Sequence, residues 1–156
     1  MAINRLGFNK WRQGITGELI NSSDGKDFLP IFLDTNFLMA LGQFPNFNIS
    51  SELDRVIPRS RKLIVLDPIF QEIQKLFDTG KPKTKIEAKL ALDFVEKNCI
   101  IRPSAYKHRN VDFVLLFNSE KENGVIATND NHLKKIARNK KIKTLYIRNK
   151  RILELR

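Results

Sequence analysis

The chain has 156 residues and a mass of 18.1 kDa, which is the size of one ordinary domain and excludes a multidomain machine. Hydrophobic residues make up 42% and charged residues 29%, so the chain has enough apolar material to fold and is not intrinsically disordered. The 28 Lys and Arg residues outnumber the 17 Asp and Glu residues, and the resulting net charge of +11 indicates a polyanionic partner, with nucleic acid as the first candidate.

Cysteine usage and hydropathy narrow the class further. With Cys99 as its single cysteine and only two histidines, the chain cannot form an internal disulfide or a typical Cys/His zinc site, which suits the reducing cytosol. No apolar run approaches the roughly 18 to 20 residues that cross a bilayer, and the first thirty residues lack the apolar core of a secretory signal. We therefore expect a cytoplasmic protein that does not enter the membrane.

The sequence divides into an N-terminal extension, residues 1–29, and one organised domain, residues 30–156. The extension is rich in glycine and contains an Asn-Ser-Ser-Asp-Gly cluster, which is typical of irregular structure. Within the domain, short apolar runs alternate with helical patterns, and this alternation predicts an α/β fold with a parallel sheet of five strands. The predicted strands are residues 31–33, 63–66, 99–101, 125–127 and 144–147.

Helical signals separate these strands. Asp67 is predicted to cap a helix that has Pro68 at its first position. Residues 111–118 are apolar almost all round, which predicts a helix buried on several sides, and residues 132–139 form a mostly basic helix. The apolar stripes predicted for the first two helices are Ile69, Ile73, Leu76 and Phe77, then Ile86, Leu90, Phe94 and Val95.

Four acidic residues follow predicted strands or belong to the helices after them: Asp34, Glu72, Asp112 and Asp130. Working sites in open α/β sheets lie beyond the carboxyl ends of the strands, so we expect these carboxylates to converge there. Asp34 and Asp130 also occupy positions typical of helix caps, and Glu72 could be a solvated helix residue. Asp112 precedes an apolar run, where an unpaired carboxylate would carry a desolvation penalty.

Carboxylates that crowd together repel one another, and a divalent cation with oxygen ligands would hold them ionised. The four acids therefore predict a site for Mg²⁺ or Mn²⁺, ions that polarise a phosphodiester and lower the pKa of a bound water. The pairs Thr35-Asn36 and Thr128-Asn129 bring short hydrogen-bonding side chains to the same rim, where they could orient ligands or a scissile phosphate.

The strand-end pattern Ile-Phe-Leu-Asp34-Thr35-Asn36, followed by Glu72, Val-Asp112 and Ile-Ala-Thr128-Asn129-Asp130, resembles the PIN-domain endoribonucleases over roughly residues 31 to 150. The resemblance implies a three-layer α/β/α sandwich around the parallel sheet and a metal site of Asp34, Asp112 and Asp130. Glu72 would bind or orient the metal-bound water, and Thr128 or Asn36 would position the nucleophile or the phosphate.

Two further features refine the resemblance. Relatives often carry a second acid directly after the third one, and Phe113 stands at that position here, which puts a second metal ion in doubt. The tail, residues 145–155, is similar to archaeal counterparts of the PIN nuclease that processes small-subunit ribosomal RNA. This similarity favours ribosomal RNA maturation as the task of the chain.

The segment between Asp130 and Glu154 has no acid. Its cations are Lys134, Lys135, Arg138, Lys140, Lys141, Lys143, Arg148, Lys150 and Arg151. Such runs are often only solvated faces, but this one follows an aspartate of the predicted metal site, and we expect it to border the cleft and bind RNA. Tyr106, Tyr146 and Phe47 are candidates for base stacking, although aromatic residues at these spacings more often belong to the core. His108 and His132 are assigned to surface or structural roles.

The leading hypothesis is therefore a divalent-metal-dependent endoribonuclease that leaves a 3′-hydroxyl, with RNA and a ribosome-assembly protein as partners. A toxin-type PIN ribonuclease blocked by an antitoxin is the second reading. A non-catalytic RNA-binding scaffold is the third, and Phe113 is its best support; a phospho-acceptor receiver is more distant because it would need adjacent acids beside Asp34. The sequence leaves the oligomeric state open, a homodimer included.

Overall fold

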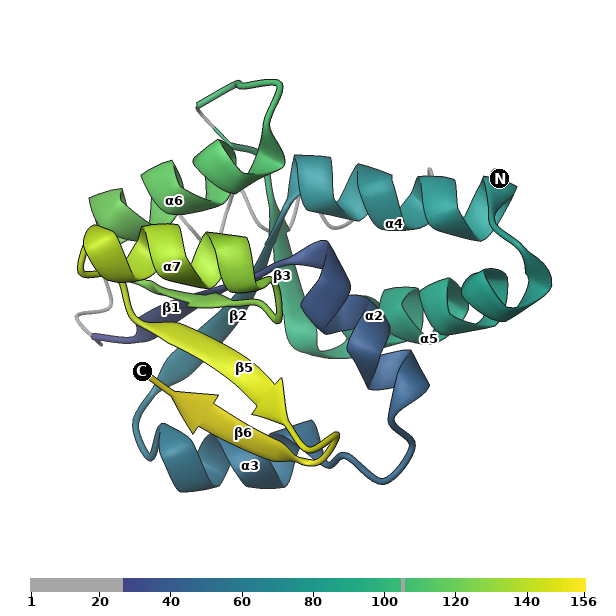
Figure 1. Cartoon of the computed structure of the whole chain (residues 1–156), viewed down its shortest axis with the longest axis horizontal. Helices are drawn as coiled ribbons and strands as arrows, with labels where there is room; N and C mark the ends of the chain where they lie inside the picture. The colour runs from purple at the N-terminus through teal and green to yellow at the C-terminus, as the bar shows by residue number, and fades with distance from the viewer. Residues whose placement is uncertain (1–26, 105) are drawn as a thin grey trace.

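A computed structural model describes residues 27–104 and 106–156, so nearly all of the predicted extension, residues 1–29, lies outside the described part. The described residues form one six-stranded sheet in the order β3-β2-β1-β4-β5-β6 (Figure 1). The strands are β1 (Leu29–Leu33), β2 (Arg61–Leu66), β3 (Cys99–Arg102), β4 (Val125–Ala127), β5 (Thr144–Arg148) and β6 (Ile152–Leu155). All neighbours from β3 to β5 pair in parallel, which confirms the five predicted strands and their orientation.

The sixth strand corrects the five-stranded prediction. β6 pairs antiparallel with β5, with Tyr146 opposite Glu154. Asn149 and Lys150 in the connection have φ values of 53° and 62°, and the N–H of Arg151 donates to the carbonyl of Arg148. Positive φ at both central positions is the requirement of a type I′ turn, which matches the twist of a hairpin. Because this turn carries Asn-Lys instead of Asn-Gly, it gives only a weak hairpin signal in the sequence.

The helices connect the strands and cover both faces of the sheet. They are α2 (Thr35–Gln43), α3 (Ile49–Val56), α4 (Asp67–Thr79), α5 (Pro82–Asn98), α6 (Val111–Glu122) and α7 (Asn131–Asn139). α4 and α5 pack on each other near β2 and β3, and α2 contacts both, whereas α6 packs on β1 and β4, α7 on β5 and α3 on β6 (Figure 1). The crossover from β3 to β4 runs back across the sheet, so the right-handed rule places α6 on the face opposite α4 and α5.

Two helix predictions were wrong in detail. Of the apolar stripe predicted for α5, Val95 is buried, but Ile86 and Leu90 are 63% and 48% exposed while Ala88 and Ala91 are buried instead. α6 is buried on several sides, as predicted, although Phe113 is 45% exposed. α4 begins at Asp67 and has no side-chain cap; the Asp67 carboxylate instead accepts a 3.2 Å hydrogen bond from the N–H of Ser104. In each case a neighbouring element decides the environment, which helical periodicity alone cannot reveal.

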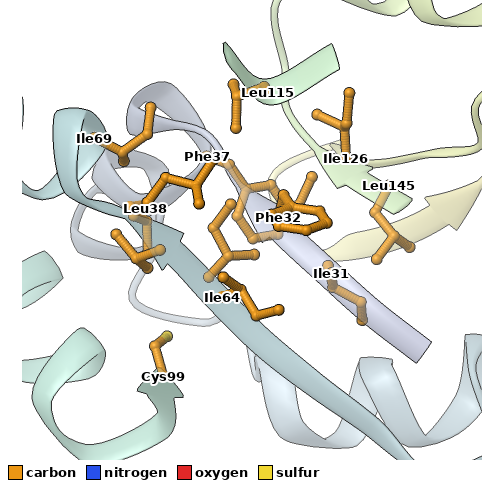
Figure 2. Packing of buried hydrophobic residues seen from close by; sticks show 14 of the residues in the cluster. Ile31, Phe32, Phe37, Leu38, Ile64, Ile69, Cys99, Leu115, Ile126 and Leu145 are labelled. Carbon is orange, nitrogen blue, oxygen red and sulfur yellow. The ribbon is translucent and has the colours of Figure 1, made fainter. Parts of the chain in front are cut away.

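The core lies between the sheet and its helices and keeps the strand ends in place. Phe32 of β1 and Ile64 of β2 are fully buried, as expected for parallel strands covered on both faces, and Figure 2 shows them packed with side chains from neighbouring elements. A Cβ on Gly124 would lie 2.8 Å from the Phe32 ring, so glycine is needed for β4 to approach β1. Cys99 is buried as predicted, which raises the pKa of its thiol. In the described part, no helix is long and apolar enough to span a membrane.

Candidate active site

The sheet topology creates a crevice between the carboxyl ends of β1 and β4. From β1 the chain proceeds to one side of the sheet, through β2 and β3, and from β4 it proceeds to the other side, through β5. Leu33 and Ala127 are register partners, so Asp34 and Thr128 follow side by side at the two strand ends. Such a switch point is where open α/β sheets bind ligands. The two sequence motifs at residues 34–36 and 128–130 therefore meet at this point.

Asp34 is the most buried acid of the site, with 7% of its surface exposed. Its Oδ1 accepts a 2.8 Å hydrogen bond from the N–H of Thr35 at the start of α2, and its Oδ2 accepts a 2.7 Å hydrogen bond from the Thr128 hydroxyl. Burial raises the pKa of Asp34 to about 6 although these two hydrogen bonds lower it, and the charges of Asp112 and Glu72 raise it further. Asp34 thus caps α2 through Oδ1, as one interpretation of the sequence predicted, and the charges of the neighbouring acids also act on its carboxylate.

Thr128, Asn36 and Asn129 form a hydrogen-bonded support behind this carboxylate. Thr128 is fully buried, and its hydroxyl also accepts a 3.1 Å hydrogen bond from the N–H of Asp130. Asn36 accepts a 3.0 Å hydrogen bond from the N–H of Asn129, whose own side chain accepts one from the N–H of Ile147 in β5. These contacts fix the β4–α7 connection against α2 and β5, so we expect Thr128 to position Asp34 and Asp130 instead of contacting a substrate.

Glu72 reaches the site from the second turn of α4. Its Oε2 accepts a 3.0 Å hydrogen bond from the hydroxyl of Thr35, the residue after Asp34. The Glu72 side chain is solvent-exposed, as the solvated-helix alternative requires, yet it lies close enough to Asp34 to raise the pKa of that carboxyl. The helix therefore presents Glu72 to the strand end and not to bulk solvent alone.

Asp112 and Asp130 complete the acidic group. Asp130 caps α7 through its Oδ1, which accepts hydrogen bonds of 2.8 and 3.1 Å from the N–H groups of His132 and Leu133. Asp112 lies in the first turn of α6 and is partly buried. Burial raises the pKa of Asp112, the charge of Asp130 raises it further, and His132 opposes this effect. The negative charge of Asp130 therefore acts on Asp112, as the charges of Asp112 and Glu72 act on Asp34.

One groove of about 650 Å³ contains all four predicted acids. It is lined by Asp34, Thr35, Asn36, Glu72, Asp112, Asn129 and Asp130, together with apolar and polar residues of α2, α4 and α5. A fifth acid, Glu87 of α5, also lines this groove; it is 8% exposed and accepts a 3.1 Å hydrogen bond from Gln43. Sequence reasoning missed Glu87 because the apolar spacing of α5 indicated Ile86 and Leu90 as its packed face, and only the packing of α2 and α4 on α5 shows that Glu87 is buried.

The donor chemistry of the groove fits a hard divalent cation, because all the acids offer carboxylate oxygens. Burial and, after it, the charges of neighbouring acids raise the pKa of Asp34 and of Asp112, and a bound cation would offset this excess of negative charge. In residues 27–104 and 106–156, however, no group of three or more His, Cys, Asp or Glu side chains is arranged so that it could hold a metal ion. The metal site built from Asp34, Asp112 and Asp130 therefore stays a prediction.

The basic run does not form the single rim that the sequence suggested. Lys140, Lys141 and Lys143 line a second groove, of about 480 Å³, together with residues at the amino-terminal ends of β1 and β4. Arg148 lies at the carboxyl end of β5, and Lys150 and Arg151 are in the hairpin turn that follows. The run is divided because α7 leads the chain from the carboxyl ends of the strands, where the acids lie, to their amino-terminal ends. β5 then returns the chain to the side of the acids.

All three aromatic candidates from the sequence already have packing partners, and Tyr106, like Phe47, packs against the hydrophobic core. The ring of Tyr146 lies under the Lys134 ammonium, 4.1 Å from the ring centroid, and its hydroxyl donates to Glu154. Tyr106 belongs to a different surface, on the loop before α6.

Comparisons with known proteins agree with this geometry. A family model described as "PIN like domain" matches residues 31–150. The chain is 27% identical over 124 residues to Ribonuclease VapC4 of Methanocaldococcus jannaschii, an alignment that covers 78% of this chain and 92% of that protein.

Solved structures show the same fold. The PIN domain endonuclease Utp24 superposes with a TM-score of 0.64 at 20% identity, covering 81% of this chain and 90% of that chain. A domain of a functionally unknown protein from Methanocaldococcus jannaschii superposes with a TM-score of 0.55 at 11% identity, covering 77% of this chain and 91% of that chain. At these identities the two structures support the architecture and the sheet topology.

Proposed function

Because this chain belongs to the PIN-like domain family, we propose that it is an endoribonuclease that depends on Mg²⁺ or Mn²⁺ and hydrolyses phosphodiester bonds of RNA. The observation that carries the proposal is the meeting of four acids from different βα connections in one groove at the switch point of the sheet. The net charge of +11 favours a polyanionic substrate, and a relative that matches most of the chain bears the name ribonuclease.

In this proposal, the predicted acids of the groove have different roles in the reaction. Asp34 and Asp130, with Asp112, would hold the divalent ion, which supplies charge to the phosphate and lowers the pKa of a water. Glu72, fixed by Thr35, would orient the attacking water in line with the scissile bond. The attacking water gives up one proton to solvent, its oxygen bonds to phosphorus, and the bond from phosphorus to the O3′ atom breaks. A 3′-hydroxyl and a 5′-phosphate result, and the displaced oxygen takes its proton from solvent.

The test compares the wild type with Asp34→Asn on a structured RNA and scores cleavage and binding separately. We expect cleavage by the wild type with Mg²⁺ or Mn²⁺, none with EDTA, and none by Asp34→Asn, whose RNA affinity stays intact. Asn replaces the carboxylate with a group of the same shape, so loss of cleavage reports the lost charge. Equal and negligible cleavage by both proteins with intact binding would instead support the RNA-binding scaffold.

For the physiological task, we favour maturation of ribosomal RNA in the cytoplasm, on account of the similarity in the tail that forms β5 and β6. The competing task is that of a toxin controlled by an antitoxin. Expression without a partner separates them: a toxin arrests growth severely and its Asp34→Asn variant does not, whereas a maturation enzyme is tolerated. Sequencing of the RNA ends that the purified protein generates then identifies the substrate.

A further inference from the structure

Four aromatic rings form a cluster on the surface beside the acidic groove, and we call this cluster the aromatic platform. It consists of Tyr106 and His108 in the β3–α6 loop and of Phe113 and Phe117 in α6. The rings of Tyr106 and Phe117 stack with centroids 4.5 Å apart, and those of Tyr106 and His108 stack at 5.9 Å. His108 meets Phe113 edge to face at 4.9 Å. The rings are therefore in mutual contact.

The platform is open to solvent although it is apolar. Phe113 and Phe117 are 45% and 40% exposed, and they lie four residues apart on one face of α6. Two neighbouring exposed phenylalanines need an explanation, because monomeric proteins rarely leave large apolar side chains grouped at the surface. His108 is exposed as well, and Tyr106 is partly exposed.

Hydrogen bonds hold the loop part of the platform against α6. The Ser104 hydroxyl donates to the carbonyl of Tyr106 at 2.7 Å, and the buried side chain of Asn118 donates to Ser104 at 3.0 Å. The N–H of Asn110 donates to Nδ1 of His108 at 3.0 Å, which sets the orientation of that ring. The rings are thus preorganised, and little side-chain entropy remains to be lost when a ligand binds.

The place of the platform beside the acidic groove and the cations around it favour an unpaired nucleotide as its ligand. Phe113 directly follows Asp112, which lines the acidic groove, and Cα atoms of consecutive residues are only about 3.8 Å apart. Lys107 and Arg109 are exposed in the same loop, and the Lys121 ammonium lies 6.0 Å from the centroid of Phe117. Aromatic faces interleaved with cations are the means by which proteins bind unpaired nucleotides, since bases stack on the rings and phosphates contact the cations.

We propose that the aromatic platform binds one unpaired nucleobase of the RNA strand next to the phosphate held in the acidic groove, and that this base stacks on the exposed ring of Phe113. This inference deepens the proposed function and rests on it. It also gives Phe113 a role. Relatives often carry a second acid at this position, and in this chain a ring stands there that would bind an unpaired base of the RNA.

The experiment measures RNA binding by fluorescence anisotropy in EDTA, so that cleavage plays no part. Phe113→Ser should raise the Kd for a short single-stranded RNA by about 5- to 150-fold, the range that loss of one base stack produces. Phe113→Leu keeps an apolar side chain without a π face and should show a similar loss, whereas Phe113→Trp should bind as the wild type does. Leu90→Ser is the matched control, because Leu90 is 48% exposed on α5; its Kd should stay within about twofold of the wild type.

Two further RNAs make the test specific for stacking. A single abasic position, moved along the strand, should weaken wild-type binding at one location and have no further effect on Phe113→Ser. A duplex of the same sequence should bind weakly to both proteins. Equal affinities of wild type and Phe113→Ser would overturn the proposal, and so would an equal loss for single-stranded and duplex RNA. A changed sedimentation coefficient of Phe113→Ser with unchanged RNA binding would identify a protein interface and also overturn it.

This design separates the two proposals. If neither the wild type nor Asp34→Asn cleaves RNA, the nuclease proposal fails, and the platform is still tested by the binding data. If cleavage requires Asp34 but Phe113→Ser binds normally, the enzyme stands and the platform fails.

Discussion

The hydroxyl of Thr128 donates a 2.7 Å hydrogen bond to Oδ2 of Asp34 and accepts one of 3.1 Å from the N–H of Asp130. One buried hydroxyl thus connects two acids that lie on different βα connections. Its donated hydrogen bond lowers the pKa of Asp34, against the larger effect of burial. We therefore expect Thr128 to help position Asp34 and to contribute to the pH range in which that carboxyl is ionised.

Replacement of this hydroxyl should shift the pH profile of cleavage. Thr128→Val keeps the shape of the side chain but removes the hydrogen bond, so the pKa of Asp34 rises further and the acid limb of the profile moves to higher pH. The free energy of unfolding should also fall by about 1 to 3 kcal/mol, because two buried polar partners lose their contact. Thr128→Ser retains the hydroxyl and should keep the wild-type limb. Identical acid limbs for Val and Ser would refute the positioning role.

Asp34→Asn should stabilise the metal-free protein at neutral pH. Burial raises the pKa of Asp34 from 3.8 to about 6, so the folded state binds this proton more tightly than the unfolded state does. The free energy of unfolding of the wild type therefore falls as pH rises from about 4 to above 6, which corresponds to about 2 to 3 kcal/mol for this shift. Asn carries no charge and escapes this loss.

Urea unfolding in EDTA checks this expectation. Asp34→Asn should be more stable than the wild type at about pH 7.5 and nearly equal to it at about pH 3.5, where both side chains are neutral. A variant that is less stable than the wild type by the same amount at both pH values would show that the carboxylate charge carries no such cost.

A divalent ion should stabilise the wild type and not Asp34→Asn. An ion that binds only the folded state adds RT ln(1 + [L]/Kd), or about 2.7 kcal/mol at a concentration of 100 Kd. Thermal unfolding with increasing Mg²⁺ or Mn²⁺ should therefore raise the Tm of the wild type by several degrees, and Asp34→Asn should respond only as it does to NaCl of matched ionic strength. Parallel Tm curves for the two proteins would argue against an ion at Asp34.

The division of the basic run predicts that its cations differ in their effect on RNA binding. Neutralising Arg148, Lys150 and Arg151 together to Gln should lower RNA affinity and reduce the slope of log K against log salt by about 2, since each contact with single-stranded RNA contributes about 0.7. The matched control removes the same charge at Lys140, Lys141 and Lys143, which line the groove at the opposite edge of the sheet. Its slope should change much less. Equal changes in both triple variants would indicate a diffuse electrostatic effect.

The strands and the convergence of the acids could be predicted from the sequence because they depend on local signals. A short apolar run that is buried on both faces specifies a parallel strand wherever its neighbours lie. The carboxyl ends of such strands share one edge, so Asp34 and Asp130 had to meet there once the alternation of strands and helices was recognised. Helix-cap chemistry points to the same two residues, since each caps the helix after its strand.

Tertiary structure decided the properties that depend on what covers a side chain. Helical spacing made Leu90 a core candidate, but α2 and α4 pack on another face of α5, and this packing also buries Glu87 at the groove. The same limit applies to the exposed ring of Phe113 and to the division of the cations between two edges. The sequence by itself determined which elements form and which acids end the strands, because these follow from contacts close along the chain. Which faces stay open and which charges share a surface followed only from packing between distant segments.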